Sequence, residues 1–136
     1  MKDYSIELDL TTMARVVYEI TANVAKERGE AKHIATEDNA SLITSFMRNA
    51  AGLLNKAFGV YSKGYETADK IVLHYSMPEN WDIAWEPEKE AESFLAYYAV
   101  AKWYELSGGD SALYLARAEE ALDNIGYSLN RRKKPL

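Results

Sequence analysis

The chain has 136 residues, of which 48% are hydrophobic and 27% charged, and its formal net charge is −5. This length and composition suit a single globular domain with one core, and the acidic balance disfavours a broad nucleic-acid-binding face. The absence of cysteine excludes disulfides, zinc–thiolate sites and a cysteine nucleophile. The sequence shows no apolar signal segment at its start, and no apolar run reaches the roughly twenty residues that a membrane-spanning helix needs.

The N-terminal segment predicts a half-buried strand followed by a helix. Apolar and polar residues alternate over residues 4–10, which is the period of a strand with one buried face. Thr11 or Thr12 can cap the following helix, whose apolar positions recur at helical spacing: Met13, Val16, Val17, Ile20 and Val24. Gly29 can adopt a positive φ at little cost, so we expect this helix to cover about residues 12–28.

The middle of the chain predicts a second helix and a second strand. Thr36 is expected to cap the helix, and a wide apolar stripe then continues as far as Phe58 and Gly59. The segment VYSKGYETADK reads as a turn-rich loop, and IVLHYSM, at residues 71–77, as a strand that Pro78 ends. Two strands separated by two helices cannot form a tight hairpin. They pair at long range within the chain, or each extends the sheet of a neighbouring subunit.

The C-terminal part predicts an antiparallel helical hairpin. A third helix is expected over residues 87–106 and is broken by SGGD, after which Asp110 caps a fourth helix. The expected seam of that helix steps by three and four residues: Leu115, Ala118, Leu122, Ile125 and Leu129. The predicted fold is therefore mainly α. It is a single four-helix domain over residues 1–130 with two short strands, followed by a basic tail at 131–136.

The sequence offers no pattern for catalysis, a cofactor or a metal. His33 and His74 stand outside any metal-ligand spacing, and no phosphate-binding glycine motif occurs. Asp82 and Glu86, beside two tryptophans, are the one carboxylate pair worth checking, and they are better explained as a turn and a helix start. We therefore expect a protein that is not an enzyme and that needs no cofactor.

Aromatic residues and a basic end are the candidate contact features. The stretch FLAYYAVAKWYEL and the segment NWDIAW supply a candidate interface set: Trp81, Trp85, Tyr97, Tyr98, Trp103 and Tyr104. Tryptophans are costly to expose, so Trp81 and Trp85 either cover the core or dock on a partner, and we expect them to cover the core. The basic end, Arg131, Arg132, Lys133 and Lys134, either contacts nucleic acid or an acidic partner, or serves only as a solubilising tail.

The segment AESFLAYYAVAKWYELSGGDSALYLARAEEALDNIGYSLNRRKKP resembles the end of head–tail connector (adaptor) proteins of tailed phages and prophages. TEDNASLITSFMRNAAGLLNKAF and IVLHYSMPENWD are similar to the acidic-start helix and the strand of related prophage proteins. The resemblance follows the order of most of the chain and rests on apolar, aromatic and alanine positions. No functional residue motif can be transferred position by position.

The resemblance implies a structural protein that forms an oligomeric ring between the portal and the tail. Its expected partners are further copies of itself, portal and tail proteins, and DNA that passes without sequence-specific binding. It would act in the virion or the host cytoplasm without contact with a membrane. The alternative is a small interaction module, because AVAKWYELSGGDSALYLARAEEAL also has the look of a tetratricopeptide-like hairpin. A third reading is a helical enzyme or small-ligand binder.

Overall fold

The computed structural model describes residues 1–29 and 33–133 and has a mainly helical fold with a small antiparallel sheet, as the sequence predicts. Its helices are α1 (Leu10–Arg28), α2 (Ala40–Ala57), α3 (Glu88–Ser107) and α4 (Ser111–Leu129), and its strands are β1 (Lys2–Asp9), β2 (Ser62–Thr67) and β3 (Lys70–Met77). Short 3₁₀ turns occupy Glu37–Asn39 (η2), Gly59–Tyr61 (η3) and Ile83–Trp85 (η4). The described residues thus contain the four predicted helices and one strand more than predicted.

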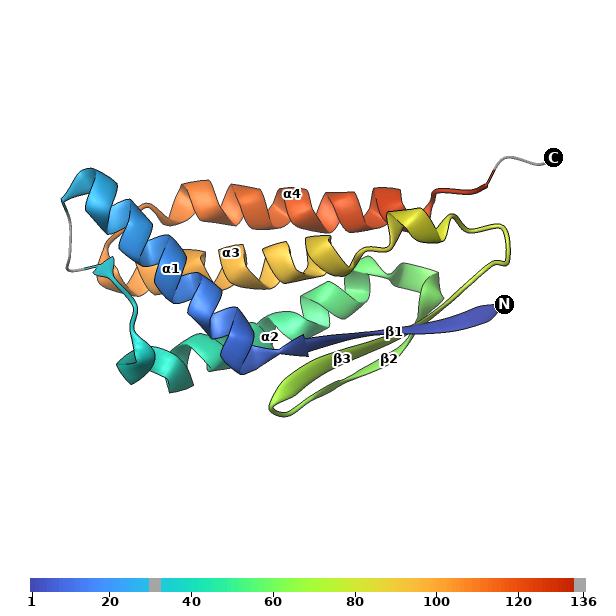
Figure 1. The fold of residues 1–136 in the computed structure, drawn as a ribbon, viewed down its shortest axis with the longest axis horizontal. Coiled ribbons are helices and arrows are strands. Elements are labelled where there is room, and N and C mark those ends of the chain that lie inside the picture. Colours follow the sequence, from blue (N-terminus) through green and yellow to red (C-terminus); the bar gives the residue numbers. More distant parts are fainter. Residues whose placement is uncertain (30–32, 134–136) are drawn as a thin grey trace.

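The central helix is α3, which packs most extensively against α4 and also against α2 and α1. Figure 1 shows α3 and α4 side by side, with α1 crossing them at an angle and α2 on the side of the sheet. Gly108 ends α3 with a left-handed φ of 91°, and Asp110 then caps α4 by accepting a hydrogen bond from the backbone N–H of Leu113. The predicted C-terminal hairpin therefore forms across a very short loop.

The start of α1 differs from the sequence prediction, whereas its end agrees with it. Asp9, rather than Thr11 or Thr12, is the N-cap, and its carboxylate accepts a hydrogen bond from the backbone N–H of Thr12 at 3.1 Å. An aspartate at this position satisfies a free donor and also favours the positive end of the helix dipole. Gly29 closes the helix with a φ of 69°.

The two predicted strands pair within the chain. β1 runs antiparallel to β3 from Lys2↔Met77 to Asp9↔Lys70, so residues far apart in sequence lie side by side. Ile6 and Leu8 of β1 point into the core with their partners on β3, as the period-two pattern predicts. Of the two alternatives that the sequence left open, the structure therefore shows pairing within the chain rather than each strand extending the sheet of a neighbouring subunit.

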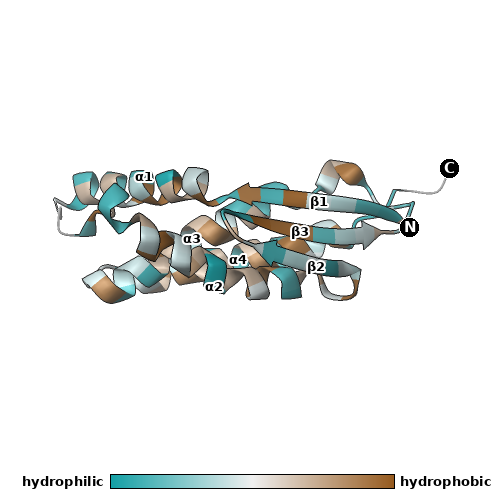
Figure 2. Ribbon diagram, turned by 90° about the horizontal axis from the view of Figure 1, so that it is seen from below, coloured by the Kyte–Doolittle hydropathy of each residue, from teal (hydrophilic) through white to brown (hydrophobic). Residues whose placement is uncertain are grey.

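The third strand, β2, replaces the predicted loop. It forms a hairpin with β3 and leaves β3 at the centre of the sheet, in the order β1-β3-β2 (Figure 2). Every residue of β2 after Ser62 is exposed, so the segment has no apolar alternation to reveal it. Gly64, with a φ of 106°, lies where the register shifts between Ser62 and Tyr65, and such bulges need a residue that tolerates positive φ. The prediction of a loop here was wrong because backbone pairing with β3 and polar contacts, such as the hydrogen bond from the Ser62 hydroxyl to the Asn55 side chain at 2.7 Å, hold a strand without buried apolar residues.

The seam of α4 is also shifted from the predicted positions. Leu115, placed in the seam by the sequence, is 36% exposed, and Leu122 is only partly buried. The described α4 buries the predicted Ala118, Ile125 and Leu129, and beside them Tyr114, Ala121 and Ser128 rather than the two leucines. Two alanines one turn apart allow α4 to approach α3 closely, so the helix is rotated toward its smaller residues.

An aromatic cluster closes the core beside the sheet. Tyr75 of β3 lies with its ring centroid 4.9 Å from Phe58 and 5.5 Å from Tyr4, and Trp81 meets it edge-on at 6.0 Å. Burial, assisted by the negative charge of Glu86, raises the pKa of the Tyr75 hydroxyl above its ordinary value. The cluster joins β1, β3, the end of α2 and the loop that leads to α3.

Candidate interaction surfaces

The six aromatic residues expected at an interface fall into two groups. Trp81 and Tyr104 are each only 2% exposed, so both belong to the core and offer no surface to a partner. Trp85 is 47% exposed, while Tyr97, Tyr98 and Trp103 are partly buried. The core explanation therefore holds for Trp81 and not for Trp85, and Tyr104 leaves the candidate set.

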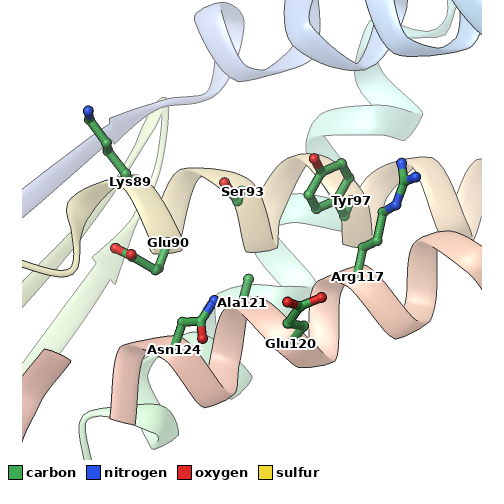
Figure 3. A pocket seen from close by; sticks show the side chains of 8 residues that line it. All are labelled: Lys89, Glu90, Ser93, Tyr97, Arg117, Glu120, Ala121 and Asn124. Atoms are coloured by element: carbon green, nitrogen blue, oxygen red, sulfur yellow. The ribbon is translucent and has the colours of Figure 1, made fainter. Parts of the chain in front are cut away.

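The exposed strip of α3 forms the floor of a groove between α1 and α4. Three adjoining hollows, of about 330, 260 and 430 Å³, are all lined by Tyr97. The first and second also share Ser93, the second and third share Ile20, and the first and third share Arg117. Figure 3 shows the part of this hollow where α3 faces α4, with Tyr97 beside Arg117. We call it the α3 groove, with Ser93 and Tyr97 as its floor.

The two walls of the α3 groove differ in chemistry. The α1 wall carries an apolar strip of Met13, Val16, Ile20 and Val24, and its C-terminal part is polar, with Asn23, Glu27 and Arg28. The α4 wall is polar and presents Arg117, Glu120 and Asn124. Arg117 lies over the Tyr97 ring at 5.8 Å and over the Tyr114 ring at 5.1 Å, which holds the cation at the mouth of the groove. The groove therefore offers apolar and charged surface side by side.

Trp85 and the predicted basic tail meet in a second surface. Arg131 stacks over the Trp85 ring at 4.3 Å, and Ile83 beside it is 48% exposed. Figure 1 places this segment, at the start of α3, on the same side of the molecule as the end of α4 and the N-terminus. We call Ile83, Trp85 and Arg131 the terminal surface.

Residues 131–133 are fixed to the body of the protein. The backbone of Arg132 forms an isolated antiparallel β-bridge with Trp81, and its guanidinium group donates a hydrogen bond to the Tyr61 hydroxyl at 2.8 Å. The backbone N–H of Lys133 donates to the Asn80 carbonyl at 2.7 Å. The expected boundary of a separate tail at 131 is therefore too early, because its first residues make contacts within the domain. Lys134 lies outside the described residues.

The carboxylate pair near the tryptophans is structural. Asp82 accepts a hydrogen bond from the backbone N–H of Ala84 at 3.1 Å and so caps the turn η4. Glu86 is exposed at the approach to α3. This is the geometry of a turn and a helix start, which the sequence favours.

The two histidines occupy different environments. His33 is buried, and its carbonyl accepts a hydrogen bond from the Trp103 indole N–H at 2.8 Å. His74 lies on the open face of the sheet, 3.4 Å from a carboxylate oxygen of Glu66. Among the described residues, no group of three or more histidine, aspartate or glutamate side chains is placed to hold a metal ion.

Sequence reasoning missed the α3 groove. The sequence placed Val16, Ile20 and Val24 in one helical apolar pattern with Met13 and Val17. In the structure they pack against the rim of the core and stay partly exposed along the groove. One available signal was the width of the apolar stripe of α1, which exceeds what one packed face requires. No helix in residues 1–29 and 33–133 combines the length and apolar character needed to cross a membrane.

Comparison with known proteins finds no matching protein-family model, no matching curated protein and no matching solved structure.

Proposed function

We propose that this chain is a structural subunit of the head–tail connector type, which assembles as an oligomeric ring between the portal and the tail of a tailed phage or prophage. The sequence resemblance supports the family. The observation that carries assembly is the α3 groove, where the apolar side chains of Val16, Ile20 and Val24 and the Tyr97 floor are only partly buried in a single chain. Apolar surface of this kind marks contact with another protein.

A ring requires two different surfaces on each subunit, because a head-to-tail contact closes only by rotation about a common axis. The α3 groove is one such surface. The terminal surface, with Ile83 and Trp85 about half exposed, is the second. The ring we propose places the terminal surface of one subunit in the α3 groove of the next. The net charge of −5 suits a channel through which DNA passes without adhering.

Size-exclusion chromatography with light scattering tests this proposal. The unmodified chain is expected to form a large, discrete oligomer as its concentration rises. Ile20→Glu places a charge in the groove wall between two hollows and should shift the assembly to monomer. Leu106→Glu is the matched control, since Leu106 is 65% exposed on α3 outside the groove, and it should assemble like the unmodified chain.

Two results would count against the ring. The first is an Ile20→Glu variant that assembles as fully as the unmodified chain, which would remove the groove from the contact. The second is a folded monomer at every concentration, with and without portal protein, which would favour the alternative of a monomeric interaction module. Gene order gives an independent test: flanking portal, capsid and tail genes support the connector, and a metabolic operon contradicts it.

A further inference from the structure

The outer side of β1 is an open sheet edge. β1 pairs with β3 on one side, and no other strand of the described chain pairs with it. The pairing with β3 continues without a register shift over all eight residues, whereas the pairing of β2 is interrupted between Ser62 and Tyr65. A regular, unpaired edge is a template for strand addition, and a bulge disrupts such a template. The sheet therefore has one edge suited to a partner strand and one that is not.

The backbone groups that would receive a partner can be identified from the ladder. The N–H of Leu10 donates to the Asp69 carbonyl at 3.2 Å, in the position that directly continues the β1–β3 register. Antiparallel pairs alternate between bonded and non-bonded positions, so the even-numbered residues of β1 bond to β3. Asp3, Ser5 and Glu7 consequently direct their N–H and C=O groups outward. No further backbone hydrogen bond within the described residues reaches these three.

The side chains of the same three residues define the chemistry of the edge. Asp3, Ser5 and Glu7 are exposed on the face of the sheet away from the helices, while Ile6 and Leu8 are buried on the other face. Asp3 accepts a hydrogen bond from the Ser76 hydroxyl, and Glu7 lies 3.7 Å from Lys70. Glu7 is nevertheless 63% exposed at its side chain, so a basic residue on an added strand can reach it. Opposite charges facing one another across strands stabilise pairing.

A second β1 is a poor occupant of this edge. Antiparallel pairing of two copies with their apolar faces on the same side, centred on Ser5, sets Asp3 opposite Glu7 twice. Centred on Ile6, it sets Asp3 opposite Asp9 twice. Like charges directly opposite one another destabilise a sheet, so the acidic pattern disfavours self-pairing and favours a basic partner.

We propose that β1 accepts, by strand addition, an extended protein segment in which basic and apolar residues alternate. The basic side chains face Asp3 and Glu7, and the apolar ones continue the helix-facing side of the sheet beyond Ile6 and Leu8. The backbone of the segment pairs with Asp3, Ser5 and Glu7. This site lies on the sheet edge and shares no residue with the α3 groove. Its N-terminal end adjoins the terminal surface, because Lys2, Tyr4 and Ile83 line one hollow, and a folded monomer suffices to form it.

Fluorescence anisotropy with synthetic peptides tests the proposal on the full chain. The probe is a labelled octapeptide that alternates lysine with valine. One comparison peptide alternates glutamate with valine. The other keeps the lysine–valine sequence but carries N-methyl groups on the amides along one edge, which removes hydrogen-bond donors and leaves the charge unchanged. Each comparison peptide should bind about tenfold more weakly than the probe, or worse.

A charge-reversed protein supplies the matched arm of the experiment. The double variant Asp3→Lys/Glu7→Lys should reverse the order of the two affinities and bind the glutamate–valine peptide more tightly than the lysine–valine peptide. Glu119→Lys/Asp123→Lys makes the same charge change on exposed positions of α4 and should keep the order of the unmodified protein. Hydrogen exchange adds a local readout, because saturating probe should slow exchange of the Ser5 and Glu7 amides.

Three results would overturn the proposal. Equal affinity for the lysine–valine peptide and its N-methylated form would show attraction by charge without strand pairing. An α4 variant that changes the order as much as the β1 variant would place the binding elsewhere. Protection of the Ser5 amide that rises with protein concentration in the absence of peptide would show that a second copy occupies the edge. If the β1 variant fails to fold, the peptide comparison on the unmodified chain still decides the outcome.

Discussion

β1 and β2 flank the same central strand, but different interactions hold them there. β1 inserts Ile6 and Leu8 into the core, each no more than 2% exposed, whereas every residue of β2 after Ser62 is exposed. The ladder of β1 is uninterrupted, and that of β2 shifts register next to Gly64. β1 is therefore stabilised by apolar burial together with hydrogen bonds. β2 buries no apolar side chain and is held by hydrogen bonds to β3 and by polar contact with α2, such as that of Ser62 with Asn55.

This difference makes the two edges of the sheet unequal as templates for an added strand. Buried side chains fix the register of β1, because a slip by one residue would turn Ile6 and Leu8 toward water. A strand fixed in register presents its outer N–H and C=O groups at constant positions. β2 lacks that constraint and carries a bulge, so its outer edge is a poorer template for another strand.

The largest test of the comparison uses two residues that flank Ile71. Leu8 of β1 and Thr67 of β2 lie opposite Ile71 from either side, but only Leu8 is buried. Leu8→Ala should lower the free energy of unfolding by about 3 kcal/mol, because it removes buried methyl groups and leaves a cavity. Thr67→Ala should cost less than about 1 kcal/mol. Urea denaturation measures both, and equal losses would contradict the distinction.

A smaller effect is expected at the bulge of β2. Gly64 has a φ of 106°, and a Cβ built there meets nothing within 4 Å, so Gly64→Ala should cost about 1–2 kcal/mol through backbone strain alone. Gly126→Ala is the matched control, since Gly126 lies inside α4 with equally open space. It should raise the free energy of unfolding by up to about 1 kcal/mol, because alanine favours helix. Thermal unfolding that moves both variants in one direction would refute the role assigned to φ.

The same comparison shows which parts of the fold a sequence can predict. β1 was predicted because its alternation of apolar and polar residues coincides with its burial. β2 was missed because SKGYET has no inward-facing apolar set, and pairing with β3 is a property of the neighbour. Asp9 was overlooked as the cap because the strand pattern extends through it, although the same residue ends the strand and caps α1.

The candidate surfaces depend on how the helices are arranged, which no periodicity specifies. The sequence marked Tyr97 as a surface candidate, but α1 and α4 must diverge over α3 before Tyr97 lines a groove. Trp81 and Trp85 look alike in NWDIAW, and the tertiary setting separates them. The indole N–H of Trp81 donates to the Ser128 carbonyl at 2.8 Å in the core, while Trp85 is left outside under Arg131.

The smallest effect on stability at neutral pH is expected at Tyr75, on the central strand between the two edge strands. This residue lies opposite Tyr4 on β1 and Ser62 on β2, and its buried hydroxyl has no hydrogen-bond partner in the described part of the chain. Tyr75→Phe removes that hydroxyl without changing the packing of the ring, so at pH 7 the free energy of unfolding should stay the same or rise by up to about 1 kcal/mol.

Alkaline pH should separate this variant from the unmodified chain. Because the pKa of Tyr75 is raised in the folded state, the unfolded chain loses this proton first, at about pH 10, and unfolding becomes easier as pH rises further. Tyr75→Phe lacks this proton, so its stability should fall less steeply between about pH 9 and pH 11. Tyr127→Phe, at a position 71% exposed, is the control and should follow the unmodified chain. Parallel pH profiles for Tyr75→Phe and the unmodified chain would show that the Tyr75 hydroxyl reaches water. The aromatic cluster would then not exclude water from the central strand between β1 and β2.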